Sequence, residues 1–141
     1  MEYKKKVIAF IQARGESERF PKKIFYKINK KYLIEILIER LKKSKLISKI
    51  VILTYKSDLN NNLVQIAKKL KCELFFGSKN DVLKRFYSAS KKFKKFNQIV
   101  RITGDCTLVD PKLVDQIILY HVNSNFDYTS NVNPSSFPDG L

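Results

Sequence analysis

The hydrophobic and polar positions of this chain follow two periodicities that alternate from one end to the other. Short, nearly continuous apolar runs are typical of strands that a parallel sheet buries on both faces. Stretches in which apolar residues recur at helical spacing are typical of helices with one buried face. The expected strands are residues 6–12, 50–54, 72–76 and 99–103, and the expected helices are residues 33–41, 63–70, 81–93 and 111–122.

This alternation of strands and helices predicts one α/β domain over residues 1–141. Because connections between parallel strands are right-handed crossovers, the expected fold is a Rossmann-like, mostly parallel sheet with helices on both faces. Asp81 and Asp110 stand where helix N-caps are expected, and Pro111 suits the first turn of a helix. Residues 127–130 are expected to form a short fifth strand, and the tail after them, which contains two prolines and a glycine, is expected to be a loop.

The chain carries a formal net charge of +15, with 28 basic and 13 acidic residues. Such a charge is common in nucleic-acid-binding proteins and would also attract a nucleotide. Many of the lysines lie along the expected helices, whereas the aromatic residues lie in the apolar stripes. A nucleic-acid-binding or polyanion-binding module stays open as an alternative function. The sequence disfavours it because no recognised nucleic-acid motif is present.

Composition and the N-terminal sequence also indicate the expected subcellular location of the protein. Apolar residues make up 44% of the chain, which favours a folded domain, and no apolar run is long enough to span a bilayer. The basic N-terminus precedes a strand-like run without a small-residue cleavage site, so no signal peptide is expected. Cys72 and Cys106 are isolated from each other and from any histidine cluster. A reduced, cytoplasmic protein with no membrane partner is therefore expected.

Cations gather in the loop that follows the first expected strand, residues 13–23. Ligands of parallel sheets bind beyond the carboxyl ends of strands, which directs attention to this loop and to the loop after the fourth strand. Arginine and lysine bind phosphate, and glycine and serine let backbone amides approach it. The spacing fits neither a Walker A loop nor a dinucleotide-binding loop, and an ordinary charged surface loop is the alternative. The candidate residues are Arg14, Gly15, Ser17, Arg19, Lys22 and Lys23.

Asp105 is the candidate metal ligand. It follows Thr103 and Gly104 at the tip of the fourth expected strand, where a carboxylate can hold Mg²⁺ against nucleotide phosphates. A turn aspartate without such a role is the alternative. Cys106 next to it has the chemistry of a nucleophile, but the single histidine, His121, lies on the fourth expected helix with no matching partner. Neither of these two residues is expected to be catalytic.

The two loops carry a resemblance to a known family. The run Ile11-Gln12-Ala13-Arg14-Gly15-x-Ser17-x-Arg19-x-Pro21-x-Lys23 resembles the opening signature of the CMP-sugar synthetases. These include the acylneuraminate and 3-deoxy-manno-octulosonate cytidylyltransferases, and the subfamily most similar is the spore coat polysaccharide biosynthesis protein F type. The likeness extends in order over residues 7–141. The other matching segments are residues 80–86, 101–106, 130–134 and 137–141.

The resemblance implies a glycosyltransferase-A-like α/β domain with a nucleotidyltransferase activity. Such an enzyme binds CTP and transfers CMP to a sugar, here expected to be a sugar acid, with release of pyrophosphate, for polysaccharide or glycan biosynthesis. The resemblance implies Mg²⁺ as cofactor, held by Asp105, and Arg14 and Lys23 as the catalytic cations. The implied nucleotide-binding residues are Ala13, Arg14, Gly15, Ser17, Arg19, Lys23, Asp81 and Arg85, and the implied sugar-binding residues are Ser130, Asn131 and Asn133.

The chain departs from the family in a few places. Lys22 and Lys30 stand where the family usually has glycine, and Tyr32 stands where it usually has proline. Family members also continue well past the position of Leu141 with a second metal-binding carboxylate, acceptor-site residues and a dimerisation element. The chain is therefore expected to be the N-terminal, C-terminally incomplete part of the domain, and the full-length chain could form a homodimer. A catalytically inactive fragment of the same fold is the remaining alternative.

Overall fold

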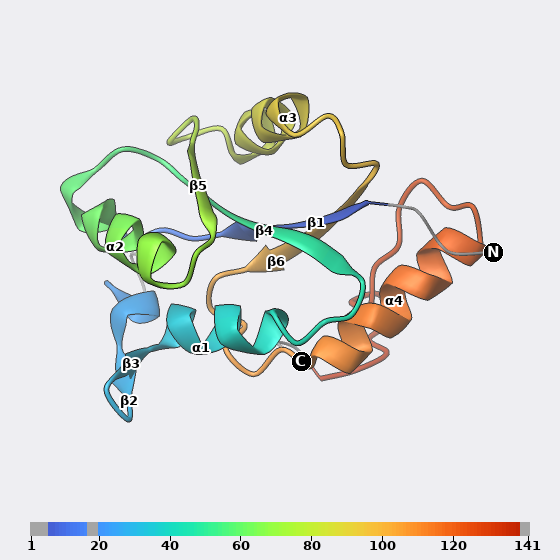
Figure 1. The fold of residues 1–141 in the computed structure, drawn as a ribbon, viewed down its shortest axis with the longest axis horizontal. Coiled ribbons are helices and arrows are strands. Elements are labelled where there is room, and N and C mark those ends of the chain that lie inside the picture. The colour runs from blue at the N-terminus through green and yellow to red at the C-terminus, as the bar shows by residue number, and fades with distance from the viewer. Residues whose placement is uncertain (1–5, 17–19, 139–141) are drawn as a thin grey trace.

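Four parallel strands form the centre of the molecule, shown by a computed structural model that describes residues 6–16 and 20–138 (Figure 1). In sheet order the strands are β5 (Glu73–Phe76), β4 (Ile47–Thr54), β1 (Val7–Gln12) and β6 (Gln98–Thr103). All three pairings are parallel, which confirms the four predicted strands and the predicted sheet type. β4 begins at Ile47, ahead of its apolar run, because its first residues still pair with β1.

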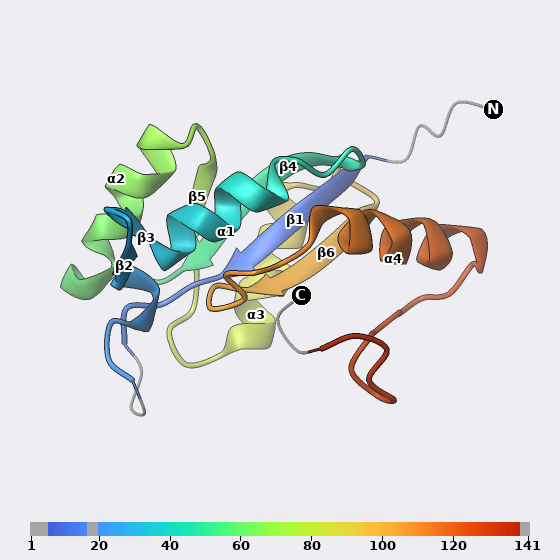
Figure 2. The ribbon, with the colours of Figure 1, turned by 90° about the horizontal axis from the view of Figure 1, so that it is seen from below.

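Helices cover both faces of the sheet, as predicted. The helices on one face are α1 (Leu33–Leu41), α2 (Asn61–Lys69) and α4 (Pro111–Asn123), and α3 (Val82–Lys92) lies on the other (Figures 1 and 2). The Asp81 carboxylate accepts a hydrogen bond from the Lys84 amide at the start of α3. The Asp110 carboxylate does the same for the Lys112 amide of α4, so both predicted caps are confirmed. Within the described residues, none of the helices is long and apolar enough to cross a membrane.

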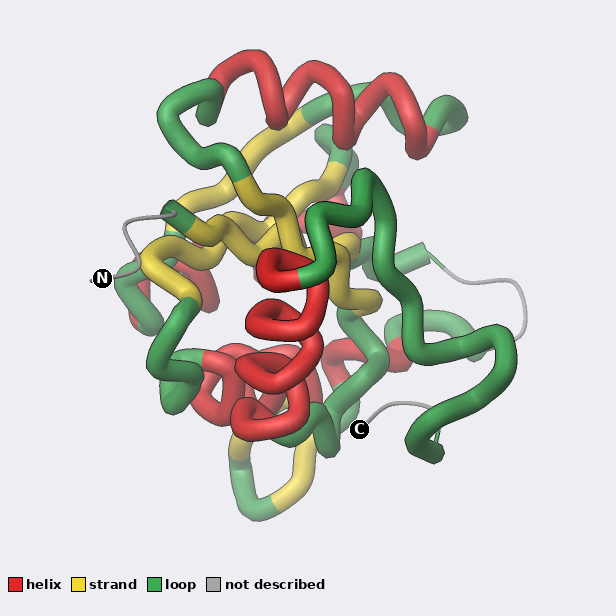
Figure 3. The backbone as a smooth tube through the Cα atoms, turned by 90° about the vertical axis from the view of Figure 1, so that its right-hand side faces the viewer, coloured by secondary structure: helices red, strands yellow, loops and turns green. Residues whose placement is uncertain are grey.

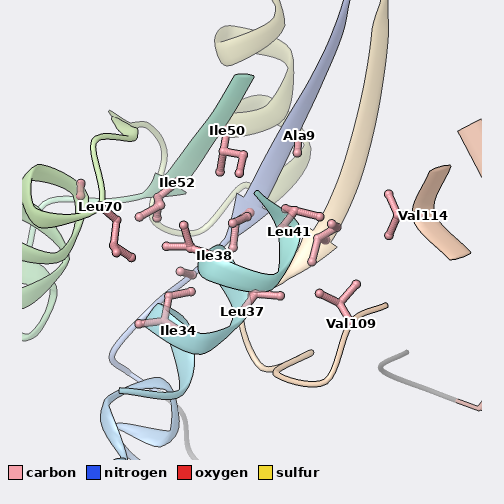
Figure 4. Close-up of a cluster of buried hydrophobic side chains, with 14 of the residues drawn as sticks. Ala9, Ile34, Leu37, Ile38, Leu41, Ile50, Ile52, Leu70, Val109 and Val114 are labelled. Carbon is pink, nitrogen blue, oxygen red and sulfur yellow. The ribbon is translucent and has the colours of Figure 1, made fainter. Parts of the chain in front are cut away.

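Two hydrophobic cores meet at β1, whose side chains point alternately to the two faces. Val7, Ala9 and Ile11 join the larger cluster, which includes side chains of α1, α2 and α4 (Figure 4). Ile8 and Phe10 join a smaller cluster with side chains of β4 and α3. None of these five side chains is more than 1% exposed. β1 is thus the strand on which both layers of the domain depend.

The strand order reverses at β1, because the chain builds β4 and β5 on one side of it and then crosses to place β6 on the other. In α/β sheets, ligands bind beyond the carboxyl ends of the strands at such a reversal. The segments that leave β1 and β6 therefore flank the expected binding crevice. This is the edge of the sheet to which the candidate residues of both loops belong.

A short antiparallel hairpin precedes α1 and is not indicated by the sequence pattern. Its strands are β2 (Lys27–Ile28) and β3 (Lys31–Tyr32). The two turn residues, Asn29 and Lys30, have φ of 48° and 66°. Two consecutive positive φ angles are typical of a type I′ turn, in which glycine is favoured at the second position. Lys30 occupies a position where the resembled family usually has glycine, and this geometry explains that preference.

We therefore expect Lys30→Gly to stabilise the protein by about 0.5–1 kcal/mol. A side chain in the left-handed region costs about 1–2 kcal/mol, and the greater chain entropy of glycine offsets part of the gain. Lys27→Gly is the matched control, since Lys27 lies in β2 without a positive φ and its replacement should destabilise the fold. Urea unfolding of the two variants measures the difference. A loss of stability in Lys30→Gly would contradict the described turn.

The predicted fifth strand at residues 127–130 is wrong. This segment lies in a long loop after α4 that turns back along the outside of the helix (Figure 3). Its side chains are largely exposed, and Thr129 forms a hydrogen bond through its Oγ1 with Nδ1 of His121, at 2.8 Å. The residue types favour a strand, but in the described structure these residues have no strand pairing to complete one. The contact also gives His121 a local partner.

Candidate functional site

The loops after β1 and β6 meet through an ion pair between Lys23 and Asp105. The Lys23 Nζ lies 3.0 Å from Oδ2 of Asp105, and the two side chains are 44% and 46% exposed. β1 and β6 are adjacent strands, and the Gly104 amide donates a hydrogen bond to the Gln12 carbonyl at 2.8 Å. A Cβ atom at Gly104 would lie 3.0 Å from that carbonyl, so glycine suits this close approach. The structure thus brings together the predicted metal ligand and one predicted phosphate-binding cation.

The carboxyl group of Asp105 is held in its ionised form. The hydrogen bond from Lys23 is the main cause that lowers its pKa, the Thr103 hydroxyl lowers it further, and partial burial opposes the shift. An ionised oxygen ligand at a half-exposed position fits Mg²⁺, which commonly uses one or two protein carboxylates and fills its other positions with water and phosphate oxygens. Among the described residues, no cluster of three or more potential metal ligands is present. Asp105 alone would therefore depend on nucleotide phosphates to complete a site.

The described part of the loop after β1 packs closely around Gly15. Its amide donates a 2.7 Å hydrogen bond to Oδ1 of Asn60, and its carbonyl accepts a 2.9 Å bond from the Lys22 amide. A Cβ atom on Gly15 would lie 2.8 Å from the Leu59 carbonyl oxygen, closer than real Cβ contacts. Close packing against the segment after β4 therefore accounts for this glycine. Lys22 has φ of 58°, which explains why the resembled family usually has glycine at this position as well.

The remaining candidates of this loop differ in accessibility. Ala13 is 2% exposed, and its amide donates to the Leu53 carbonyl at 3.1 Å, which continues the sheet beyond the end of β1. Arg14 is the first exposed residue after the strand, and its charge acts on Glu16 and Tyr55. Ser17 and Arg19 lie outside the described residues. Their predicted role in phosphate binding stays a prediction.

The start of α3 carries the other two nucleotide-binding candidates, Asp81 at its N-cap and Arg85 in its first turns, and both have structural partners. Asp81 caps α3. Arg85 is only 1% exposed, and its Nε and Nη2 donate to the carbonyls of Ser78 and Lys79 at 2.8 and 3.0 Å. Its Nη1 is buried without a hydrogen-bond partner in the described part of the chain. Arg85 thus holds the loop between β5 and α3, and its Nη1 joins the hydroxyls of Thr54 and Ser57 as buried polar atoms without a partner in the described part of the chain.

Tyr55 links this segment to the loop after β1, a connection that sequence reasoning missed. Its ring is 3% exposed, with the Lys79 ammonium and the Arg85 guanidinium each 5.3 Å from the centroid. Glu16 forms an ion pair with Lys79 at 3.0 Å, and its carboxylate accepts a hydrogen bond from the Tyr55 hydroxyl. These bonds to Lys79 and Tyr55 lower the pKa of Glu16, while burial and then Glu16 raise the pKa of Tyr55. The ends of β1, β4 and β5 are therefore tied together by side chains.

The sugar-binding candidates lie in the loop after α4. Ser130 and Asn133 are exposed and Asn131 is half-buried. Their hydrogen bonds in the described structure are local: the Ser130 hydroxyl accepts from the Val132 amide at 3.3 Å, and the Asn131 carbonyl accepts from the Ser136 amide at 3.1 Å. None of the three bonds to Asp105 or to the described part of the loop after β1. Their role toward a sugar stays a prediction, because their side chains carry no contact that selects a ligand.

Two surface depressions lie at the opposite edge of the sheet, by the amino ends of β4 and β5. They measure about 370 and 350 Å³, and both are bordered by Lys49 and Glu73, which form an ion pair with each other. Other lysines line them, yet no candidate residue of either loop does. Lys23 and Asp105 instead lie at a half-exposed, charged surface.

Comparison with known proteins identifies the family to which the chain belongs. The sequence pattern of the family described as "Cytidylyltransferase" matches residues 8–136 of the chain. The chain belongs to the cytidylyltransferase family. Since this family is named for an enzymatic activity, the chain is related to nucleotidyltransferases, and the family resemblance seen in the sequence is confirmed.

Relatives within the cytidylyltransferase family include two curated proteins. Uncharacterized protein MJ1063 of Methanocaldococcus jannaschii is 43% identical over 128 residues, which is 91% of this chain and 52% of that protein. Spore coat polysaccharide biosynthesis protein SpsF of Bacillus subtilis is 33% identical over 131 residues, covering 90% of this chain and 54% of that protein. The chain thus spans about half the length of these relatives.

Solved structures confirm the fold. A cytidylyltransferase from Leptospira borgpetersenii shares 36% identity with a TM-score of 0.79, over 84% of this chain and 50% of that one. A CMP:2-keto-3-deoxy-manno-octonic acid synthetase complexed with CTP shares 17% identity with a TM-score of 0.71, over 85% of this chain and 48% of that one. At this identity the second likeness concerns the fold alone. The α/β nucleotidyltransferase fold predicted from the sequence is therefore confirmed.

Proposed function

We propose that this chain binds CTP with Mg²⁺ and contributes to the transfer of CMP to a sugar, with a sugar acid as the expected class. The observation that carries the proposal is the meeting of Lys23 and Asp105 at the strand-order reversal, in a member of the cytidylyltransferase family. A basic side chain and an ionised carboxylate side by side suit a triphosphate that carries a divalent cation.

The proposed reaction is a substitution at the α-phosphorus of CTP. The oxygen of a sugar hydroxyl forms a bond to phosphorus, the bond to the bridging oxygen breaks, pyrophosphate leaves and the hydroxyl proton passes to solvent. Arg14 and Lys23 offset the negative charge of the triphosphate and the leaving group, mainly by positioning and electrostatics. Ala13, Gly15, Ser17, Arg19, Asp81 and Arg85 are the further proposed nucleotide-binding residues. Ser130, Asn131 and Asn133 are proposed to border the sugar.

Asp105 is proposed to hold the Mg²⁺. The ion, when bound, would neutralise charge on the phosphates and the leaving pyrophosphate. The contribution of this chain is the ionised Asp105 oxygen, kept unprotonated by the neighbouring Lys23. A full metal site, the acceptor pocket and a homodimer are proposals for the whole protein, because the chain spans about half of its relatives.

The proposal predicts that CTP with Mg²⁺ raises the melting temperature more than ATP or GTP with Mg²⁺ does. At a ligand concentration about 100 times the dissociation constant, the gain in unfolding free energy should be about 2.7 kcal/mol. Asp105→Asn should lose the part of the CTP effect that depends on Mg²⁺, because a neutral amide is a weaker ligand for this ion. Thermal scans with matched nucleotide concentrations measure both effects.

Equal shifts for all three nucleotides would contradict the cytidine assignment and leave a general triphosphate site. A polyanion-binding module predicts a different outcome, namely DNA binding with a steep salt dependence and no preference for CTP. An inactive fragment would bind CTP without releasing pyrophosphate from CTP and a panel of sugar acids. The nucleotide panel, a salt titration and a pyrophosphate assay therefore distinguish the three.

A further inference from the structure

Asn60 has an unusual position for a helix-capping residue. It ends the short 3₁₀ helix η2 (Asp58–Asn60) and occupies the N-cap position of α2. Asparagine at this position normally accepts a hydrogen bond from an amide of the first helical turn. Here the side chain makes no such cap bond, although it is only 1% exposed. The side-chain amide of Asn60 instead forms hydrogen bonds with residues outside α2.

The Asn60 side chain joins the segments that leave β1 and β4. Its Oδ1 accepts the 2.7 Å hydrogen bond from the Gly15 amide, and its Nδ2 donates to the Tyr55 carbonyl at 2.9 Å. A primary amide can satisfy one donor and one acceptor at the same time, and both backbone groups would otherwise be buried without a partner. The side chain thus fixes the distance between Gly15 and the end of β4.

This contact lies directly beside the proposed phosphate-binding residues. Gly15 follows Arg14, and Glu16 on its other side is held by Tyr55 and Lys79. The Gly15 carbonyl also receives the amide of Lys22, one residue before Lys23. Asn60 therefore holds Gly15, whose carbonyl in turn accepts the Lys22 amide, and its own side chain stays buried.

We propose that Asn60 is a positioning residue that keeps Arg14 and Lys23, described cations of the loop after β1, in the arrangement that binds a phosphate chain. The inference rests on the proposed function, because it assumes that Arg14 and Lys23 face phosphates. Without Asn60 the Gly15 amide would be buried and unpaired, so the turn would move and the cations on both sides of it would lose their alignment. The site would keep its positive charges, but the cations would no longer be aligned with a phosphate chain.

Asparagine is the residue whose side chain fits both partners. An aspartate would keep an oxygen for the Gly15 amide but would place a second oxygen against the Tyr55 carbonyl and add negative charge near the phosphates. Alanine would satisfy neither group. Asn60→Ala and Asn60→Asp therefore separate the two hydrogen bonds.

The test measures tripolyphosphate binding by calorimetry and the hydrogen exchange of the Gly15 amide by NMR. Asn60→Ala should raise the dissociation constant for tripolyphosphate about tenfold and speed exchange at Gly15. Asn60→Asp should keep that amide slow to exchange, because the acceptor oxygen remains. Asn62→Ala is the matched control, since Asn62 is an exposed asparagine of α2. Leu63→Ala is the second control, because Leu63 is fully buried in α2 and its loss destabilises the fold without removing either hydrogen bond of Asn60.

The outcomes are decisive at a temperature at which circular dichroism shows all variants folded. If Asn60→Ala binds tripolyphosphate like Asn62→Ala, or loses no more affinity than Leu63→Ala, the positioning role is overturned. Equal binding of CTP and ATP by the natural sequence would overturn the cytidine assignment alone, since the tripolyphosphate comparison still decides the role of Asn60. A natural sequence that binds neither tripolyphosphate nor CTP would overturn both.

Discussion

Replacing Lys23 by alanine should weaken CTP binding about tenfold or more. A hydrogen bond between a charged donor and a phosphate contributes about 1.5–3 kcal/mol, and the loss of Lys23 also leaves the Asp105 carboxylate without its partner at 3.0 Å. The uncompensated carboxylate would repel the triphosphate in the absence of Mg²⁺. Arg14→Ala should cause a similar loss without this second effect. Isothermal titration with CTP, with and without Mg²⁺, measures both variants.

The control for these variants is Lys92→Ala. Lys92 is an exposed cation at the end of α3, the helix on the sheet face opposite to α1, α2 and α4. Its ammonium lies over the rings of Phe75 and Phe93. Its removal changes the net charge by the same amount as the loop variants, so it reports the effect of the general positive field. If Lys92→Ala weakens CTP binding as much as Lys23→Ala, the chain attracts nucleotides by diffuse charge and the loop is not a specific site. The double variant Lys23→Ala/Asp105→Ala should recover part of the binding lost without Mg²⁺.

Phe10→Ala should lower the unfolding free energy by about 3–5 kcal/mol, the largest loss of stability expected from a single side chain here. The ring of Phe10 is fully buried, with its centroid 6.0 Å from that of Phe86 and 6.1 Å from that of Phe93. Truncation would leave a cavity between β1 and α3 that the surrounding helix and sheet cannot close. Urea denaturation followed by circular dichroism measures the change.

Phe126→Ala is the matched control for this truncation. Phe126 is 51% exposed in the loop after α4 and contacts one ring, that of Tyr120. The Phe126→Ala substitution removes the same atoms as Phe10→Ala but leaves no cavity in the core. The unfolding free energy should therefore change by less than about 1 kcal/mol. A loss below 1 kcal/mol in Phe10→Ala itself would contradict the described core between β1 and α3.

The strands of the sheet could be predicted from the sequence because parallel strands buried on both faces need continuous apolar runs. Gly104 and Asp105 could also be placed, since a polar turn directly after such a run must lie at the carboxyl edge. The contact between Lys23 and Asp105 was not predicted, because it depends on β1 and β6 being neighbours in the sheet. Strand order itself is a property of long-range pairing, which the local pattern does not contain.

The elements that were missed depend on contacts far apart in the sequence or on unusual backbone angles. The β2–β3 hairpin has strands of two residues each and a lysine at the glycine position of its turn, so its usual signal is absent. Residues 127–130 have the composition of a strand, but in the part of the chain that the structure describes no strand pairs with them. Asn60 belongs to a run of three asparagines, and only the fold shows that its side chain is buried whereas those of Asn61 and Asn62 are exposed.

The alternation of β1 between two cores determines where this protein can tolerate insertions and deletions. Adding or removing one residue within β1 would turn every following side chain of the strand to the opposite face. A deletion ahead of Phe10 would place its ring in the larger core, where Ala9 now lies, and an insertion there would place it where Ile11 now lies. The turn between β2 and β3 lies at the surface, so extra residues at Asn29 and Lys30 would leave both cores intact. Length variation among homologues should therefore accumulate in the hairpin and be absent from β1.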